Sequence, residues 1–75
     1  MSIGERVKQL RQRRRLSQSE LAARTGLRQS HISQLESGAR NNPQAHIVIA
    51  LAKVLDCSTD FLLGMYEQQE VSRVS

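Results

Sequence analysis

The sequence predicts an all-α fold, a compact domain of five helices. Apolar residues recur at intervals of three and four, as on one face of a helix, and no segment alternates as a strand does. At 75 residues the chain is long enough for one small domain. Its single cysteine, Cys57, excludes an internal disulfide, and one cysteine with two histidines cannot form a structural zinc site. A well-packed core must therefore hold the fold.

The first helix is expected over residues 2–14. Ser2 and Glu5 have the spacing of a capping box, in which each side chain accepts a hydrogen bond from the backbone of the other residue. Arginine and lysine near the end of this segment suit the negative end of the helix dipole. The apolar stripe of the helix consists of Ile3, Val7 and Leu10.

Two short helices are expected next, separated by a glycine. Ser17 and Glu20 form a second capping box, and Gly26 ends the helix that they start, because glycine readily takes the left-handed conformation found there. The third helix is expected over residues 29–37 and ends at Gly38. The inward-facing positions of the two helices are Leu21, Ala22, Ile32 and Leu35.

A fourth helix is expected over residues 44–55 and is apolar nearly all round, so it is either central to the core or shared with a partner chain. A short fifth helix over residues 59–63 stops at Gly64. We therefore expect a domain at residues 1–64 and a tail at residues 65–75 that contributes to a dimer or is partly disordered.

The segment over residues 18–35 has the form of a helix-turn-helix. The small side chain of Ala22 lets two helices approach closely, and Gly26 permits the tight turn between them. Ile32 and Leu35 then hold the second helix against the core. Four independent positions agree with this motif, so its chance occurrence in a short chain is low.

The third helix is expected to carry an uncharged, hydrogen-bonding face opposite its apolar face. Glutamine can form two hydrogen bonds to an adenine edge, and serine can bond to several bases. Arg28 and Arg40 border this face, where cations suit phosphates. An ordinary polar surface is the alternative, and the helix-turn-helix spacing argues against it. The face consists of Gln29, Ser30, Ser33, Gln34 and Ser37.

The charge is unevenly distributed. The chain carries a net charge of +4, but residues 1–40 hold nine basic and three acidic side chains, and residues 41–75 hold two and four. A basic half suggests a polyanionic partner, although a solvated arginine-rich surface without a partner is the alternative. Proteins that bind RNA or single strands stack bases on aromatic side chains. The basic half has none, since the two aromatic residues are Phe61 and Tyr66. Duplex DNA is therefore the expected target.

Residues 2–64 resemble the Cro/C1-type, or Xre, family of phage and bacterial helix-turn-helix repressors. The matching stretches read LSQSELAARTGL, HISQLESG and LAKVLDCSTDFLLG. The resemblance implies a compact five-helix domain of the lambda-repressor type. It also implies a homodimer that binds a pseudo-palindromic operator in double-stranded DNA.

The resemblance also assigns roles to individual residues. Gln18 would contact phosphate and brace Gln29, and Arg11 with Glu36 would form an internal ion pair. Three departures from the family pattern are visible. Arg28 replaces the usual capping serine or threonine, Asp56 replaces a glycine after the fourth helix, and the loop at Asn41 and Asn42 is one residue longer. The base-reading residues are expected to be Gln29, Ser30, Ser33 and Gln34. Phosphate contacts are expected from Gln18, Arg28, Arg40, Asn41, Asn42, Arg14 and Arg15.

The apolar residues near the C-terminal end exceed what one small core needs. We expect the excess to form a dimer surface, to which Ile47 and Val54 could add; the alternative is that the tail folds back over it. The residues expected at this surface are Phe61, Leu62, Met65 and Tyr66. Cys57 is expected to be a buried small apolar side chain rather than a redox sensor.

No nucleophile has a base and an orienting acid at a suitable spacing, so no enzyme activity, cofactor, metal or small-molecule ligand is expected. The chain has no apolar run of membrane-spanning length, and a lone cysteine suits a reducing compartment, so a cytoplasmic location is expected. The predicted function is that of a dimeric, sequence-specific DNA-binding regulator of transcription, similar to a repressor. The alternative is an antitoxin or another protein-interaction module with the same fold.

Overall fold

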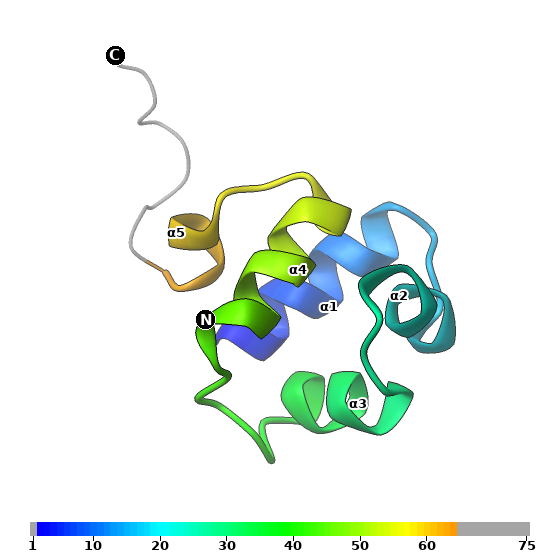
Figure 1. Ribbon diagram of the computed structural model, residues 1–75, viewed down its shortest axis with the longest axis horizontal. Helices are drawn as coiled ribbons and strands as arrows, with labels where there is room; N and C mark the ends of the chain where they lie inside the picture. Colours follow the sequence, from blue (N-terminus) through cyan, green and yellow to red (C-terminus); the bar gives the residue numbers. More distant parts are fainter. Residues whose placement is uncertain (1, 65–75) are drawn as a thin grey trace.

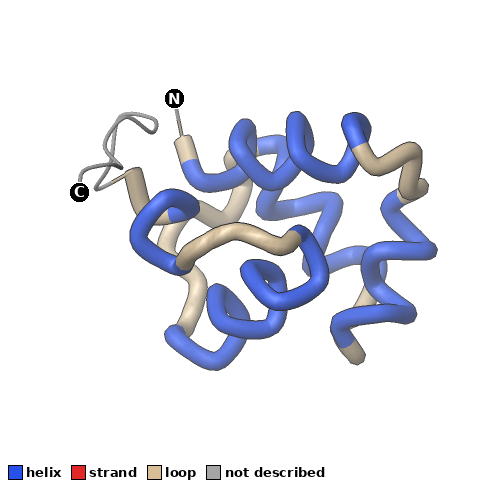
Figure 2. The backbone as a smooth tube through the Cα atoms, turned by 90° about the horizontal axis from the view of Figure 1, so that it is seen from above, coloured by secondary structure: helices blue, strands red, loops and turns tan. Residues whose placement is uncertain are grey.

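Five helices form the described part of the chain, residues 2–64, in a computed structural model (Figure 1). Only helices and loops are present there (Figure 2), so the predicted all-α fold is confirmed. Predicted and observed helix bounds differ by one residue at the ends of the first, fourth and fifth helices, where the terminal residues are caps. The helices are α1 Ile3–Arg13, α2 Gln18–Thr25, α3 Gln29–Ser37, α4 Ala45–Leu55 and α5 Thr59–Leu62.

Both predicted capping boxes are present. The backbone N–H of Ser2 donates to Glu5 Oε1 at 2.8 Å, and that of Ser17 donates to Glu20 Oε1 at 2.7 Å. In return, the backbone N–H groups of the two glutamates donate to the serine hydroxyls. The hydrogen bonds from the serine backbones lower the pKa of both glutamates. This contribution to stability is therefore present above the ordinary glutamate pKa and is lost as the pH falls through the lowered value.

Left-handed residues end several helices. Gly26 and Gly38 have φ values of 76° and 90°, as the sequence predicts. Asp56 ends α4 with φ 57°, so an aspartate here takes the left-handed conformation that glycine adopts most readily. Arg15 also has φ 57°, which nothing in the sequence indicates. The backbone of this turn is held by a hydrogen bond from the N–H of Leu16 to the carbonyl of Arg11 at 3.1 Å.

The core takes side chains from all five helices, and α4 contacts α1, α2 and α5 (Figure 1). Leu62 is fully buried, so the prediction that it lies at a dimer surface is wrong: it closes the core beneath α5. Ile47, with 5% of its surface exposed, likewise packs inside. The buried apolar residues are Ile3, Val7, Leu21, Ala22, Ile32, Leu35, Ile47, Val48, Leu51, Ala52, Leu55 and Leu62.

Gly4 allows α1 to lie directly against α3. A Cβ atom at this position would lie 1.9 Å from the carbonyl oxygen of Leu35, which is backbone and cannot rotate away. Gly4→Ala should therefore lower the free energy of unfolding by about 3 kcal/mol, the upper range for overpacking. Urea denaturation followed by circular dichroism measures this, with Gln9→Ala at an exposed position of α1 as the control. Alanine in an unobstructed helix position would instead stabilise by about 0.5–1 kcal/mol, and a gain of that kind would contradict the close contact.

Candidate nucleic-acid interface

A three-residue turn, residues 26–28, joins α2 to α3 and fixes their relative position. Ala22 is buried where the helices approach, and its carbonyl accepts the N–H of Leu27 at 3.0 Å. On the other side of the turn, Ile32 and Leu35 are almost completely buried. The inner faces of both helices are thus committed to the core, which leaves the opposite face of α3 outward.

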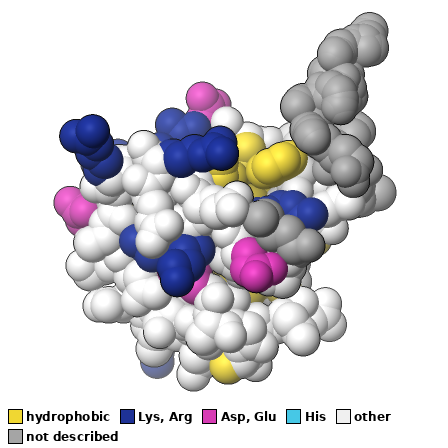
Figure 3. Space-filling model, turned by 180° about the vertical axis from the view of Figure 1, so that it is seen from behind, with side chains coloured by type: hydrophobic (Ala, Val, Ile, Leu, Met, Phe, Trp, Pro, Cys, Tyr) yellow, Lys and Arg dark blue, Asp and Glu magenta, His cyan; other side chains and the backbone are white. Residues whose placement is uncertain are grey.

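The outward face of α3 is the uncharged surface that the sequence predicts, and all five of its side chains are exposed: Gln29, Ser30, Ser33, Gln34 and Ser37. Seen from behind, the lower part of the molecule, where α3 lies, has few charged side chains, whereas lysine and arginine are interspersed with acidic residues above it (Figure 3). Arg28, the N-cap residue of α3, makes no side-chain capping bond, as its chemistry requires. The first N–H groups of α3 therefore remain available to an anion.

The segment after α3 folds back onto that helix. The backbone N–H of Arg40 donates to the carbonyl of Gln34 at 3.0 Å, and Arg40 Nε donates to Gln34 Oε1 at 2.6 Å. Ser37 Oγ donates to the same carbonyl at 3.1 Å and accepts the N–H of Ala39. Two residues predicted for separate roles, a base contact and a phosphate contact, are thus joined in one pair.

A polar groove of about 490 Å³ lies beside this pair, between α3 and the start of α4. The N-cap of α4, Gln44, makes no side-chain capping bond, so the first N–H groups of α4 are also available. The Nε2 atom of His31 is buried without a hydrogen-bond partner. Two guanidinium groups and a helix N-terminus together favour an anion of phosphate size. The lining residues are Arg28, His31, Arg40, Asn42, Pro43, Gln44, His46 and Ile47.

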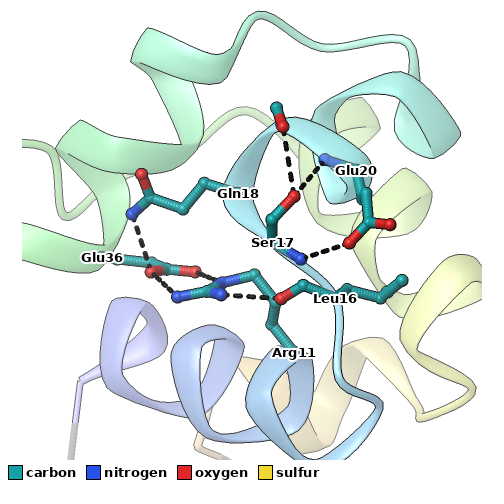
Figure 4. Close-up of polar contacts among 7 residues, drawn as sticks. Arg11, Leu16, Ser17, Gln18, Glu20 and Glu36 are labelled. Carbon is teal, nitrogen blue, oxygen red and sulfur yellow. Dashed lines mark hydrogen bonds and ion pairs between the residues drawn. The ribbon is translucent and has the colours of Figure 1, made fainter.

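A buried ion pair joins α1 to α3 (Figure 4). Arg11 donates from Nε to Glu36 Oε2 at 2.7 Å and from a terminal nitrogen to Oε1 at 2.9 Å, the paired geometry that strengthens such contacts. Its other terminal nitrogen donates to the carbonyl of Leu16 at 2.8 Å. The hydrogen bonds with Glu36 raise the pKa of Arg11. The ion pair implied by the family resemblance is therefore present.

Gln18 extends this ion pair into a network of three helices. Its Nε2 donates to Glu36 Oε1 at 3.0 Å, so the side chain is turned toward the end of α3 (Figure 4). Gln18 therefore braces Glu36 through this bond, and no hydrogen bond joins Gln18 to Gln29, the residue that the resemblance implies it would brace. Sequence reasoning missed the contact because positions 18 and 36 are distant in the chain. The amide of Gln18 keeps its oxygen and one N–H for another ligand.

The structure does not bring Arg14 and Arg15 to the outward face of α3. The turn that follows α1 lies on the far side of α2 from α3 (Figure 1). Arg14 lies near Cys57, which follows the C-terminal end of α4. Burial raises the pKa of the Cys57 thiol, and the nearby charge of Arg14 opposes that shift. These two arginines are therefore separated from the other predicted phosphate contacts.

The exposed apolar residues differ from those predicted for a dimer surface. Ile49 is 47% exposed and Leu63 is 52% exposed, and both line a shallow groove with Pro43 and Ala45. Phe61 is half-buried, whereas Met65 and Tyr66 lie outside the described residues. Sequence reasoning missed Ile49 because α4 is apolar nearly all round. Position 49 lies two residues after buried Ile47, which puts it on the opposite side of the helix.

The remaining sequence predictions concern Cys57, metal binding and membrane-spanning helices. Cys57 is half-buried against the core, as a small apolar side chain would be. Within residues 2–64, no three histidine, cysteine or acidic side chains are grouped so that they could hold a metal ion. None of the helices described there combines the length and apolar character needed to cross a membrane.

A capped helix, a glycine turn and a second helix with its outer face free define a helix-turn-helix domain. The sequence profile of the helix-turn-helix family matches residues 7–62, so the chain belongs to that family. It is of the Cro/C1, or Xre, type, as the resemblance in its motifs implies. Among curated proteins, it is 35% identical over 68 residues to the transcriptional regulator SinR of Bacillus subtilis, and 33% identical over 73 residues to ImmR of the same species. These alignments cover 91% and 97% of this chain, but only 61% and 54% of the two relatives.

Solved structures give the same fold. SinR in complex with DNA superposes with a TM-score of 0.78 at 37% identity, covering 80% of this chain and 95% of that one. The P22 c2 repressor in complex with a synthetic operator superposes with a TM-score of 0.79 at 33% identity, covering 84% of this chain and 94% of the repressor chain. The restriction-modification controller protein C.AhdI of Aeromonas hydrophila superposes with a TM-score of 0.75 at 34% identity, covering 81% of this chain and 91% of the controller chain.

Proposed function

We propose that this chain is a sequence-specific double-stranded DNA-binding domain of a transcriptional regulator, with a repressor-like mode of action. One observation carries the proposal: the outward face of α3 consists of exposed, uncharged, hydrogen-bonding side chains on a helix fixed by the core and by Glu36. A rigid helix of this kind suits the major groove, where base edges carry distinct donors and acceptors. The likeness to SinR bound to DNA and to the P22 c2 repressor bound to its operator supports this assignment.

The proposed roles follow from position. Gln29, Ser30, Ser33 and Gln34 would contact base edges. The groove between α3 and α4 would receive a backbone phosphate, held by Arg28 and Asn42 together with the first N–H groups of α4. Asn41 in the same loop and Gln18 at the start of α2 would contact neighbouring phosphates, which position the protein without reading sequence. Arg14 and Arg15 have no part in this arrangement.

We propose further that the domain acts as a homodimer on a pseudo-palindromic operator. Ile49 and Leu63 are the large apolar side chains most exposed among the described residues, and the second copy would cover them. Phe61 in α5, together with Met65 and Tyr66 later in the sequence, would extend the interface. A two-fold arrangement would place two copies of α3 about 34 Å apart, in successive major grooves of the duplex.

Selection of bound sites from random duplex DNA, at about physiological salt, tests this function. The expected product is an inverted repeat whose half-sites are centred about one helical turn, or a multiple of it, apart. An isolated half-site would contradict the dimer but not the reading face. Recovery of no motif by a protein that circular dichroism shows to be helical would contradict DNA recognition and favour a protein-interaction module.

A further inference from the structure

The two glutamines on the outward face of α3 differ in their surroundings. Gln34 has its side-chain oxygen bound by Arg40 Nε at 2.6 Å, while its main-chain oxygen accepts the N–H of the same arginine. Gln29, five residues earlier and also exposed, makes no side-chain hydrogen bond in the described structure. The first amide is therefore fixed by the protein, and the second is free to turn.

The contact with Arg40 settles which atoms Gln34 can offer. A flipped amide would place its NH₂ group against the Nε–H of Arg40, donor against donor, so the oxygen stays toward the guanidinium. The NH₂ group of Gln34 is then left without a protein partner and can donate to a ligand. The two terminal nitrogens of Arg40 add further N–H donors beside it, because an arginine has no acceptor. Gln34 Oε1 keeps one lone pair, but it lies beside the positive guanidinium, which disfavours the approach of another donor, so the pair presents mainly donors.

A unit dominated by donors favours one base edge in the major groove. Adenine offers an acceptor and a donor there, so a glutamine must use both its oxygen and its nitrogen to read it. Guanine offers two acceptors, N7 and O6. We propose, on the basis of the function proposed above, that Gln34 and Arg40 act as a single unit that selects guanine at one position in each half-site. Gln29 remains free to bind adenine through both of its amide atoms.

Site selection with single variants tests the unit. The wild-type domain should select guanine over adenine about tenfold or more at one position of each half-site, in the range of a good two-bond contact. Arg40→Ala frees the amide of Gln34, so this preference should fall below about threefold while the inverted repeat and its other positions persist. Gln34→Ala should remove the preference at the same position, and the double variant should be no worse than either single one, as for coupled residues. Replacing the selected guanine by 7-deazaguanine, which lacks the N7 acceptor, should weaken wild-type binding and leave Arg40→Ala binding nearly unchanged.

Arg28→Ala is the matched control, because Arg28 is an exposed arginine that borders the same face without an amide partner. It should weaken binding to all sequences alike and reduce the salt dependence by about one phosphate contact. If Arg40→Ala behaves as Arg28→Ala does, with the guanine preference intact, Arg40 is a phosphate contact and the unit is refuted. The unit is also refuted if no position of the wild-type half-site prefers guanine over adenine. A wild-type selection without any motif overturns the proposed function and this inference with it. A selection that yields a motif without the guanine preference overturns this inference alone.

Discussion

Replacing Glu36 by alanine should lower the free energy of unfolding by about 3–5 kcal/mol, the range observed when one partner of a buried ion pair is removed. The side chain of Glu36 is 3% exposed and that of Arg11 is 11% exposed, so the remaining guanidinium would lack both a counter-ion and adequate water. The amide of Gln18 would lose its acceptor as well. Domains of this size have a total stability of about 4–11 kcal/mol, so the loss is a large part of the total and the variant should unfold at a much lower urea concentration.

Urea denaturation followed by circular dichroism measures this loss. Glu20→Ala is the control, because Glu20 is an exposed glutamate whose removal costs one capping contact of about 0.5–1.5 kcal/mol. The double variant Arg11→Met/Glu36→Leu separates the charge effect from the contact itself. Buried ion pairs replaced by apolar residues of similar size are often neutral, so the double variant should be more stable than Glu36→Ala alone. A loss below about 1 kcal/mol for Glu36→Ala would contradict the structural role of the ion pair.

The double change Gln29→Ala/Ser33→Ala should reduce operator affinity by roughly 30- to 1,000-fold, because it removes one two-bond contact and one single contact to base edges. Both side chains are exposed and alanine favours helices, so the stability of the fold should not fall. Binding to random duplex DNA should also persist, because no phosphate contact is removed. Fluorescence anisotropy with operator and scrambled duplexes measures both affinities in the same buffer.

Gln9→Ala/Gln12→Ala is the matched control for this change. Both residues are exposed on α1, so the control also removes two exposed polar side chains, but from a helix outside the proposed interface. The control should keep its full affinity for operator DNA. Retained operator affinity in the Gln29→Ala/Ser33→Ala variant would show that α3 does not read the sequence.

Local chemistry made much of the fold predictable from sequence. Each capping box depends on two residues three positions apart, and each glycine at a helix end supplies a conformation that other residues rarely adopt. The spacing of Ala22, Gly26 and Ile32 likewise constrains only neighbouring turns. The left-handed Arg15 was not predictable, because arginine carries no local preference for that conformation and the surrounding turn imposes it.

The site was predictable as a surface but not as a set of contacts. The exposed face of α3 follows from helical periodicity alone. The bonds from Gln18 to Glu36 and from Arg40 to Gln34 depend on how separate segments return to the same helix, which no local pattern encodes. Leu62 and Leu63 show the same limit at the apolar surface. They are adjacent in one short turn, and only the path of the chain after α4 decides that Leu62 is buried and Leu63 exposed.

The network of Arg11, Glu36 and Gln18 has a thermodynamic consequence for recognition. It anchors the C-terminal end of α3 to α1 and to α2 before any ligand arrives. The conformational entropy of ordering this helix is therefore lost when the domain folds, not when it associates with its target. Association then requires no coupled folding, and its heat-capacity change should match the surface buried between two rigid bodies. A domain whose α3 is held in this way already has its binding conformation in the free state.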